Sequence, residues 1–256
     1  MITVQIIGTG STGNCAVVNR DFMVDLGVSR SLVERNADNL DALRHISAAF
    51  ITHEHADHAN PSLVKCLYEI RPDVFKRQFF IPSQTYEKLT KANSFLGKAF
   101  EDYPLTNIIN KDSEFDFRTR GGKWHVRCFH APHGLAECVG FVFTSPDDET
   151  LFWATDLENL EFAGVGNAKY DVICCEGNWD TECLTNALKD PETAGHAESS
   201  LRHQSVEAFE QFVSDHAKAG GKIIQLHNSG SFGRYSRYNN VYTGDVPDYS
   251  KPPLDI

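Results

Sequence analysis

Four potential metal ligands lie within the six residues His53-Glu54-His55-Ala56-Asp57-His58, and this cluster constrains the fold more than any other feature. The apolar segment Ala48 to Thr52 runs directly into it and predicts a short buried strand. Strand alternation, continued past the end of that strand, places positions 53, 55 and 57 on one side. Imidazole nitrogens and carboxylates are good ligands for zinc, manganese or iron. A chance cluster on a polar loop is the alternative, at odds of roughly one in a thousand for such a motif. The cluster therefore predicts a metal site at a strand end.

The rest of the chain alternates between short apolar runs and stretches with helical signals. We predict strands over residues 2–7, 15–18, 22–25, 48–52, 79–81, 113–118, 123–129, 139–143, 150–154, 170–175 and 222–226. We predict helices over residues 29–44, 60–70, 83–93, 181–189 and 204–218. Residues 94–122 are otherwise irregular, and the tail 228–256 lacks periodicity. Runs of strands with helices between some of them favour two mixed sheets flanked by helices.

A glycine-rich turn, residues 8–14, joins the first two predicted strands. It lacks the Gly-Lys-Ser/Thr of a nucleotide-binding loop, and it leads into a strand rather than a helix. We therefore expect a structural turn near the metals and not a phosphate cradle.

The composition predicts a globular cytoplasmic protein. Hydrophobic residues make up 41% and charged residues 23% of the chain, and the seven cysteines form no Cys-x-x-Cys pair. The N-terminus lacks a basic segment followed by a long apolar run, and no apolar run approaches about 18 residues, so neither a signal peptide nor a membrane span is expected. The formal net charge of −11 argues against broad coating of nucleic acid. It leaves open a phosphodiester held at metal ions, whose own charge must be counted.

Several short motifs carry a resemblance to a known family. Besides the histidine cluster, they are Ile6–Cys15, Met23–Ser29, Pro132–Gly134, Val139–Phe141, Ala154–Asp156, Glu176–Asp180 and Leu226–Ser229. Together they resemble the metallo-β-lactamase superfamily, whose signature is His-x-His-x-Asp-His, and within it they are most similar to the YycJ/WalJ branch. The resemblance implies an αββα sandwich, a single domain over residues 1–256, and a metal-dependent hydrolase.

The resemblance further implies a ligand set for two divalent transition-metal ions, Zn²⁺ or Mn²⁺. The ligands of the first ion would be His53, His55 and His133. The ligands of the second ion would be Asp57, His58 and His227, and Asp156 would bridge the two ions.

Three of these ligands have plainer alternatives. His130 competes with His133 for the same role. Asp156 ends the apolar run 151–154, where a buried acid is costly unless it is paired or metal-bound, but it could also be a surface turn residue. His227, at the end of the last predicted strand, could be an ordinary polar loop residue.

Asp57, His227 and His196 are the candidates for a direct catalytic role. Asp57 would hold the attacking water, and His227 or His196 would help to protonate the leaving group. Gly195-His196 is similar to a Gly-His-Leu-Ser element of the branch, although Ala197-Glu198-Ser199 follows it here. A plain loop position for His196 is an equal alternative.

Other residues are expected around the ligands. The resemblance implies that Asp25 orients a ligand histidine. Glu176, Asn178 and Asp180 follow a predicted strand and should face the same rim, whereas Trp179 stands where the branch usually has histidine, so no family role is carried over to it. Ordinary core or surface roles are expected for the remaining histidines His45, His125, His203 and His216.

Because Asp57 completes the cluster, the resemblance favours phosphodiester hydrolysis by a hydroxide that bridges the two ions. The first hypothesis is a YycJ-like nuclease acting on DNA or RNA. Its local positive rim would come from Arg202, Lys218, Lys222, Arg234 and Arg237.

Two further hypotheses stay open. One is a phosphodiesterase for cyclic or other small nucleotides, of the phage anti-Pycsar type, in which tail aromatics stack on a base. Those aromatics are Phe232, Tyr235, Tyr238, Tyr242 and Tyr249, and packing of the tail on the domain or on another subunit is their alternative role. The other is an inactive binding module, which the complete ligand set opposes. No membrane partner is expected, and related enzymes are often homodimers.

Overall fold

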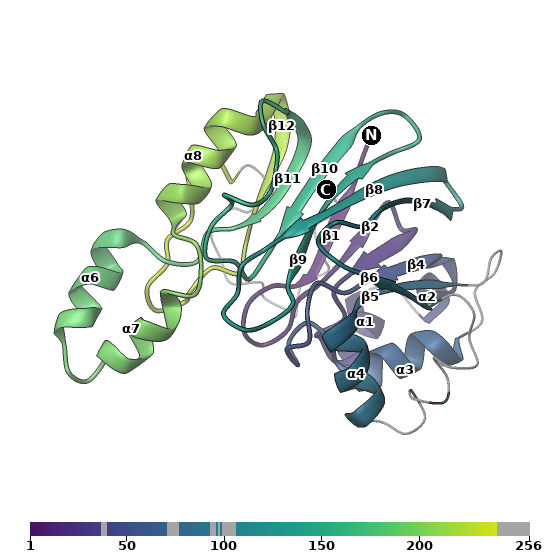
Figure 1. Ribbon diagram of the computed structural model, residues 1–256, viewed down its shortest axis with the longest axis horizontal. Helices are drawn as coiled ribbons and strands as arrows, with labels where there is room; N and C mark the ends of the chain where they lie inside the picture. Colours follow the sequence, from purple (N-terminus) through teal and green to yellow (C-terminus); the bar gives the residue numbers. More distant parts are fainter. Residues whose placement is uncertain (37–39, 71–76, 93–95, 97, 99–105, 240–256) are drawn as a thin grey trace.

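Two mixed sheets of six strands each lie face to face at the centre of the computed structural model (Figure 1). The structure describes residues 1–36, 40–70, 77–92, 96, 98 and 106–239. The first sheet has the strand order β1-β2-β3-β4-β5-β6. Its strands are β1 (Val4–Gly8), β2 (Cys15–Val18), β3 (Phe22–Val24), β4 (Ala48–Phe50), β5 (Gln78–Pro82) and β6 (Thr106–Ile109). The pairs from β3 to β6 are parallel.

The second sheet has the order β12-β11-β10-β9-β8-β7. Its strands are β7 (Glu114–Thr119), β8 (Gly122–His130), β9 (Val139–Thr144), β10 (Thr150–Ala154), β11 (Tyr170–Glu176) and β12 (Ala217–Leu226). Strands β10, β11 and β12 are parallel neighbours, and β7 to β10 form an antiparallel meander.

Aromatic side chains from both sheets fill the space between them. Phe50 of the first sheet stacks on Phe80 with ring centroids 4.5 Å apart, and it meets Phe143 of the second sheet edge-on at 5.0 Å. Phe22 likewise packs on Trp124 at 5.0 Å. Large buried rings of this kind contribute much of the apolar area removed from water, which holds the two sheets together.

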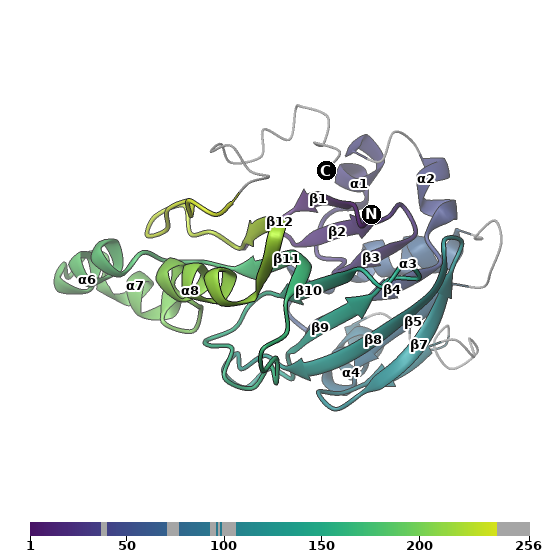
Figure 2. The same ribbon diagram turned by 90° about the horizontal axis from the view of Figure 1, so that it is seen from above.

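Helices cover the two outer faces, as Figure 2 shows from above. The first sheet is covered by α1 (Arg30–Asn36), α2 (Leu40–His45), α3 (Pro61–Glu69) and α4 (Ser83–Ala92). The second sheet is covered by α8 (Val206–His216), while α6 (Thr181–Lys189) and α7 (Ala194–Ser200) extend from the body. The predicted αββα sandwich of two mixed sheets flanked by helices is therefore confirmed. Within the described residues, no helix is long and apolar enough to cross a lipid bilayer.

Some predicted element boundaries were wrong. The helix predicted over 29–44 is two helices, and strand β6 and helix α7 were not predicted. The helix predicted over 204–218 ends at His216, because β12 begins at Ala217, five residues before the predicted strand. Residues 217–221, Ala-Lys-Ala-Gly-Gly, have low strand propensity and no alternation, so the sequence did not predict this part of the strand, which pairs with β11 from Ala217 onward.

Candidate metal centre

The ends of several strands meet at one edge of the sandwich. Asp25 follows β3, and the segment with His53 follows the neighbouring parallel strand β4. In the second sheet, Asp156 follows β10 and His227 follows β12, with β11 parallel between them. His133 follows β8, which runs in the same direction as β10 because two antiparallel steps separate them. The carboxyl ends of parallel strands form a crevice outside a sheet, so this edge gathers polar side chains from distant parts of the chain.

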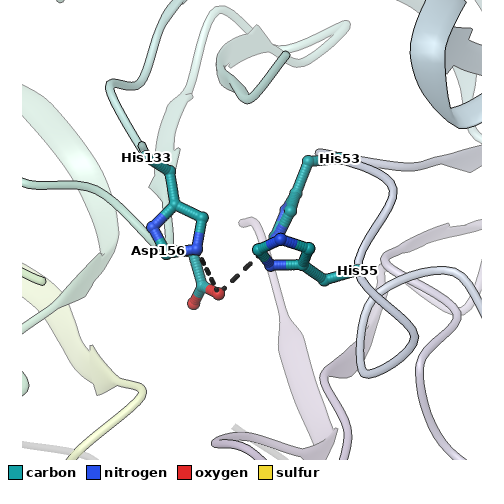
Figure 3. Close-up of side chains that lie close together, drawn as sticks. All are labelled: His53, His55, His133 and Asp156. Atoms are coloured by element: carbon teal, nitrogen blue, oxygen red, sulfur yellow. Dashed lines mark ion pairs between the residues drawn. The ribbon is translucent and has the colours of Figure 1, made fainter. Parts of the chain in front are cut away.

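Four of the predicted ligands form a first group, in which three histidines lie close to the carboxylate of Asp156 (Figure 3). One ligand atom from each of His53, His55, His133 and Asp156 lies within 4.8 Å of the others. The Nε2 atoms of His53 and His133 lie 3.6 and 3.7 Å from Asp156 Oδ2. The structure thus brings His133 to the group, whereas the described contact of its competitor His130 is with the ring of Phe162.

A second group shares the same aspartate. Asp57, His58, Asp156 and His227 also offer ligand atoms within 4.8 Å of one another. His58 Nε2 lies 3.2 Å from Asp156 Oδ2, and His227 Nε2 lies 3.3 Å from Asp156 Oδ1. Oδ2 of Asp156 therefore faces histidines of both groups, and Oδ1 faces His227 of the second group.

Buried partners orient the histidines of the second group. His58 Nδ1 lies 2.8 Å from Asp25 Oδ2, and Asp25 Oδ1 accepts hydrogen bonds from the backbone N–H and the hydroxyl of Thr52 at 2.8 and 2.9 Å. Because Asp25 holds Nδ1, Nε2 is the nitrogen of His58 that faces Asp156 and that could bind a metal ion. Asp25 thus lies where it was expected, behind a candidate ligand.

The backbone is strained at three of these positions. Asp25, Asp156 and His227 have φ values of 59°, 51° and 49°, in the left-handed region that non-glycine residues rarely adopt. Each of them lies at or near the end of a strand, where the left-handed turn carries the side chain toward the edge of the sandwich. Such strain costs on the order of 1–3 kcal/mol per residue and tends to cluster at functional sites.

Glu176 extends the cluster on the side of the second sheet. Its carboxylate is fully buried, and Oε1 lies 3.1 Å from His227 Nδ1 and 2.7 Å from His203 Nδ1. Asn178 donates to the backbone oxygen of His227 at 2.7 Å. The rings of His203 and His227 stack with centroids 4.9 Å apart. Asp156, Glu176, His203 and His227 consequently form a third group of potential ligands beside the second.

Burial and charge set the protonation of the cluster. Burial alone would raise the pKa of Asp156, but the imidazoles of His227 and His58 hold it well below its ordinary value. Burial would lower the pKa of His227, yet Asp156 and Glu176 raise it to about 9. Burial dominates at His53 and lowers its pKa well below the ordinary range. In the metal-free protein, Asp156 is thus an anion at neutral pH whose charge is balanced by protonated His227 and His58, because Asp156 and Asp25 also raise the pKa of His58 against the effect of burial.

The chemistry of these residues fits the binding of divalent metal ions. Among the described residues, His53 Nε2 and His227 Nε2 are buried nitrogens without a hydrogen-bond partner, and both face Asp156. A buried polar atom without a partner is costly, unless a bound cation takes the lone pair. Imidazole and carboxylate together are the donor set of zinc and manganese sites.

His203 is a site residue that the sequence did not reveal, because the predicted helix from residue 204 made it seem an ordinary helix neighbour. Ser205 caps α8, so His203 lies in the preceding turn, where its Nδ1 contacts Glu176. The Gly-His-Leu-Ser element, to which Gly195-His196 is similar, matches His203-Gln204-Ser205 in its His-x-Ser spacing. That spacing directly before a helix is the signal that could have found it.

The structure does not bring His196 to the cluster. Its side chain is exposed on α7, and its described ring contact is with Phe232, at 5.4 Å between centroids. His196 therefore lies apart from the predicted ligands, whereas His203 lies beside them. The other three histidines set aside by the sequence do have partners, but these lie outside the cluster. His45 contacts Arg120, His125 contacts Glu114 and Asp116, and His216 contacts the backbone oxygen of Ala168.

Other expected rim residues have structural roles. Asp180 caps α6 through the backbone N–H groups of Glu182 and Cys183, and it pairs with Arg234 at 2.7 Å. Trp179 donates its indole N–H to the backbone oxygen of His203 at 2.7 Å and so supports that turn.

Some of the tail aromatics that were expected to stack on a base are buried in the structure. Phe232 is only 6% exposed and packs against Leu184 and Ala197, which opposes a stacking role for it. Tyr238 packs against the core between the second sheet and α8. Tyr242 and Tyr249 lie outside the described residues.

Comparison with known proteins identifies the fold. Residues 20–217 match the family model described as the beta-lactamase superfamily domain. Among solved structures, the short form of human tRNase Z is similar at a TM-score of 0.61 and 14% identity, covering 90% of this chain and 93% of that one. The metallo-beta-lactamase fold protein YhfI from Bacillus subtilis is similar at 0.61 and 13%, covering 91% and 89%. Unliganded yeast PDE1 is similar at 0.58 and 12%, covering 91% and 90%. No curated protein matches the chain.

Proposed function

The chain belongs to the β-lactamase superfamily, and from this premise we propose that it hydrolyses phosphodiesters with two divalent transition-metal ions. The observation that carries the proposal is the pair of ligand groups that share Asp156. The first group would hold one ion through three histidines, and the second group would hold the other through Asp57, His58 and His227. Asp57 matters most for the choice of substrate, because a second ion bound by a carboxylate and a histidine of one motif favours phosphodiester over β-lactam hydrolysis. A YycJ-like nuclease is the first form of this proposal.

When bound, the ions would lower the pKa of a water molecule and neutralise charge that builds up on a phosphoryl group. The protein supplies orientation and proton handling. The side chain of Asp57 is 25% exposed, whereas that of Asp156 is 3% exposed, so Asp57 is the carboxylate within reach of the attacking water. It would accept a hydrogen bond from that water and fix its direction of attack.

His203 is the candidate for protonation of the leaving oxygen. Burial would lower its pKa, but the carboxylate of Glu176, 2.7 Å from Nδ1, raises it. With Nδ1 directed at Glu176, the proton on Nε2 is the one free to move to a substrate. The side chain is 17% exposed, unlike the fully buried His53, so it can reach a bound molecule. His227 stays in the proposal as a ligand beside it, supported by the same carboxylate.

A panel of substrates tests the proposal. Purified protein loaded with Mn²⁺ or Zn²⁺ is incubated with single-stranded DNA, duplex DNA, RNA, cyclic nucleotides and bis(p-nitrophenyl) phosphate. We expect hydrolysis of at least one phosphodiester and its loss in Asp57→Ala and His58→Ala. His125→Ala is the matched control, because the His125 side chain is 43% exposed and contacts Glu114 and Asp116, away from the ligands. Full activity in Asp57→Ala would refute the mechanism.

Charge around the site favours small nucleotides as a second candidate substrate. Lys218 pairs with Asp171 at 2.7 Å near the start of β12, whereas His227 follows the end of that strand. The guanidinium of Arg234 is occupied by three carboxylates, those of Asp180, Glu207 and Glu210.

Arg202 is the one member of the predicted basic rim that the described contacts place beside the ligands, with its backbone oxygen 3.4 Å from His133 Nδ1. A long polyanion needs many cations along its path, and its binding falls steeply with salt. A substrate with one or two phosphates needs little beyond the ions.

Salt dependence separates the two substrate classes. If small nucleotides are the substrate, kcat/KM for a cyclic nucleotide should change little between low and physiological salt, and long RNA or DNA should be cleaved poorly. Efficient cleavage of long nucleic acid with a steep fall in rate on added salt would favour the nuclease instead. Absence of bound metal in elemental analysis would favour the third hypothesis, an inactive binding module.

A further inference from the structure

The glycine-rich turn between β1 and β2 contacts the second group of ligands at both of its ends. We infer that this turn, residues 8–14, is a positioning device for that group, and that Asn14 is the residue through which it acts. The inference rests on the proposed function in that it assumes a second metal ion held by Asp57, His58 and His227. Asn14 would not bind the ion but would hold two of its ligands in place.

Asn14 is 4% exposed, and hydrogen bonds fix the orientation of its side-chain amide. Its Oδ1 accepts the backbone N–H of Gly10 at 2.8 Å, and its Nδ2 donates to the backbone oxygen of Gly10 at 3.0 Å. Nδ2 also lies 2.8 Å from His58 Nε2, 3.2 Å from the backbone oxygen of Asp57 and 3.5 Å from Asp57 Oδ2. One amide group therefore contacts both ligands that the His-x-His-x-Asp-His motif gives to the second ion.

These acceptors allow Asn14 to keep its role when an ion is bound. An ion would take His58 Nε2, and the amide would keep the oxygens of Asp57 and the backbone oxygen of Gly10 as acceptors. A hydrogen bond to Asp57 Oδ2 fixes the rotation of that carboxylate. Partners of this kind orient metal ligands and typically change metal affinity by about 10- to 100-fold when they are removed.

Backbone hydrogen bonds also join the turn to the loop that carries His53 to His58. The backbone N–H of Asn14 donates to the oxygen of Asp57 at 2.7 Å, and Gly27 donates to the oxygen of Asn14 at 2.8 Å. Gly27 also lies so close to the ligand loop that a Cβ atom there would come within 1.6 Å of the Asp57 oxygen. Asn14, Gly27 and Asp57 are therefore tightly packed against one another. We expect a substitution at Asn14 to displace Asp57.

The other end of the turn reaches the remaining ligand of the group. Thr9 Oγ1 accepts the backbone N–H of His227 at 2.8 Å. His227 has a left-handed backbone, and this hydrogen bond helps to hold it in that conformation. The turn therefore contacts Asp57 and His58 from one end and His227 from the other. No comparable contact from residues 8–14 to His53, His55 or His133 is found among the described hydrogen bonds.

The test is metal titration of Asn14→Ala, with Asn19→Ala as the matched control. Asn19 lies just beyond the other end of β2, and its Oδ1 accepts the backbone N–H of Thr3 at 2.7 Å, away from the ligands. Calorimetric titration of the metal-free proteins with Zn²⁺ or Mn²⁺, with elemental analysis after dialysis, gives the number and affinity of bound ions. Wild type and Asn19→Ala should bind two equivalents. In Asn14→Ala the second equivalent should bind about 10- to 100-fold more weakly, while the first stays unchanged within about twofold.

The melting temperature of the metal-free proteins separates positioning from folding. If Asn14→Ala fails to fold, Asn14→Ser keeps a short donor near the Asp57 oxygen and should show a smaller loss of the second equivalent. If Asn14→Ala binds two equivalents with wild-type affinities, the inference is overturned while the proposed function stays intact. Equal weakening of both equivalents would also overturn it, since the turn would then act only on the fold. Two equivalents in wild type without phosphodiesterase activity would refute the proposed function and not the role of Asn14.

Discussion

Glu176→Gln is the substitution for which the structure gives the clearest expected effect. Both oxygens of the carboxylate act as acceptors in a fully buried position. Oε2 accepts the backbone N–H of Leu157 at 2.8 Å, and Oε1 faces Nδ1 of His203 at 2.7 Å and Nδ1 of His227 at 3.1 Å. Glutamine has one acceptor oxygen and a donor NH₂ group, so in either orientation the NH₂ group meets an N–H donor. The exchange keeps the volume of the side chain and removes one accepting partner.

The magnitude follows from what is lost. If the remaining oxygen faces the histidines, the buried N–H of Leu157 is left without an acceptor, which costs about 1–3 kcal/mol in the free energy of unfolding. The oxygen facing His227 is then no longer charged, and loss of such support lowers metal affinity by about 10- to 100-fold. That change corresponds to about 1.4–2.8 kcal/mol of binding free energy. It should fall on the second ion, because His227 belongs to that group.

Two measurements check this expectation. Urea denaturation of the metal-free protein gives the free energy of unfolding, and metal titration gives the affinities of the two equivalents. Glu210→Gln is the matched control, since its carboxylate is held by Arg234 and Ser236 and does not contact a ligand histidine. The control should lose stability and keep both metal affinities. Unchanged binding of the second equivalent in Glu176→Gln would refute the reasoning.

Three further predictions concern catalysis, pH and metal removal. His203→Ala should lower kcat by about 10²- to 10⁴-fold on a substrate with a poor leaving group and much less with p-nitrophenolate, whereas His196→Ala should keep the wild-type rate; equal losses in steady-state assays would contradict the assignment. The hydrogen bond from Arg234 lowers the pKa of Glu210 below 4.5, so its contribution to stability is present above pH 4.5 and is lost as the pH falls through the lowered value. Acid titration of the free energy of unfolding should therefore be steeper for wild type than for Glu210→Gln, and identical slopes would oppose this role. Chelation should lower the melting temperature by about 5 to 10 °C for each ion present at 100 times its Kd, measured by calorimetry, and no shift would contradict metal binding in the folded state.

The layers of the fold could be predicted from the sequence because hydrophobic periodicity reports which face of an element is buried. Strands such as β11, with the apolar run Val172 to Cys175, are buried on both faces and read clearly. Strand β12 begins with Ala217-Lys218-Ala219-Gly220-Gly221, where no such pattern exists, so its first half was missed. Helix α7, with its short polar sequence, has few buried side chains and gives an equally weak signal.

The candidate site could be predicted where its residues lie close together in the sequence or within a recognisable motif. Residues 53–58 could be recognised because four potential ligands lie within six positions. The family resemblance adds His133, Asp156 and His227. His203 could not be found in this way, since its role comes from Glu176, 27 residues away, and from a turn whose extent depended on where α8 begins. The contacts of Asn14 to residues 43 and 44 positions further on are likewise a product of packing.

Each sheet provides a buried carboxylate that contacts Nδ1 of a histidine in the second group. In the first sheet, Asp25 follows β3 and directs His58 through Nδ1 at 2.8 Å. In the second sheet, Glu176 ends β11 and contacts His227 through Nδ1 at 3.1 Å. Each carboxylate thus stands at the end of a strand and leaves the Nε2 atom of its histidine toward Asp156.

In the first group, the described hydrogen bonds of His53 Nδ1 and His133 Nδ1 involve no carboxylate. His53 Nδ1 meets the hydroxyl of Thr52 at 3.1 Å, and His133 Nδ1 lies 3.4 Å from the backbone oxygen of Arg202. A charged partner raises the basicity of a ligand imidazole more than a neutral one does. Removal of either supporting carboxylate should therefore weaken the second ion and spare the first. Asp25→Asn and Glu176→Gln, which act from opposite sheets, should converge on the same binding defect, and weakening of the first ion alone in either variant would break the argument.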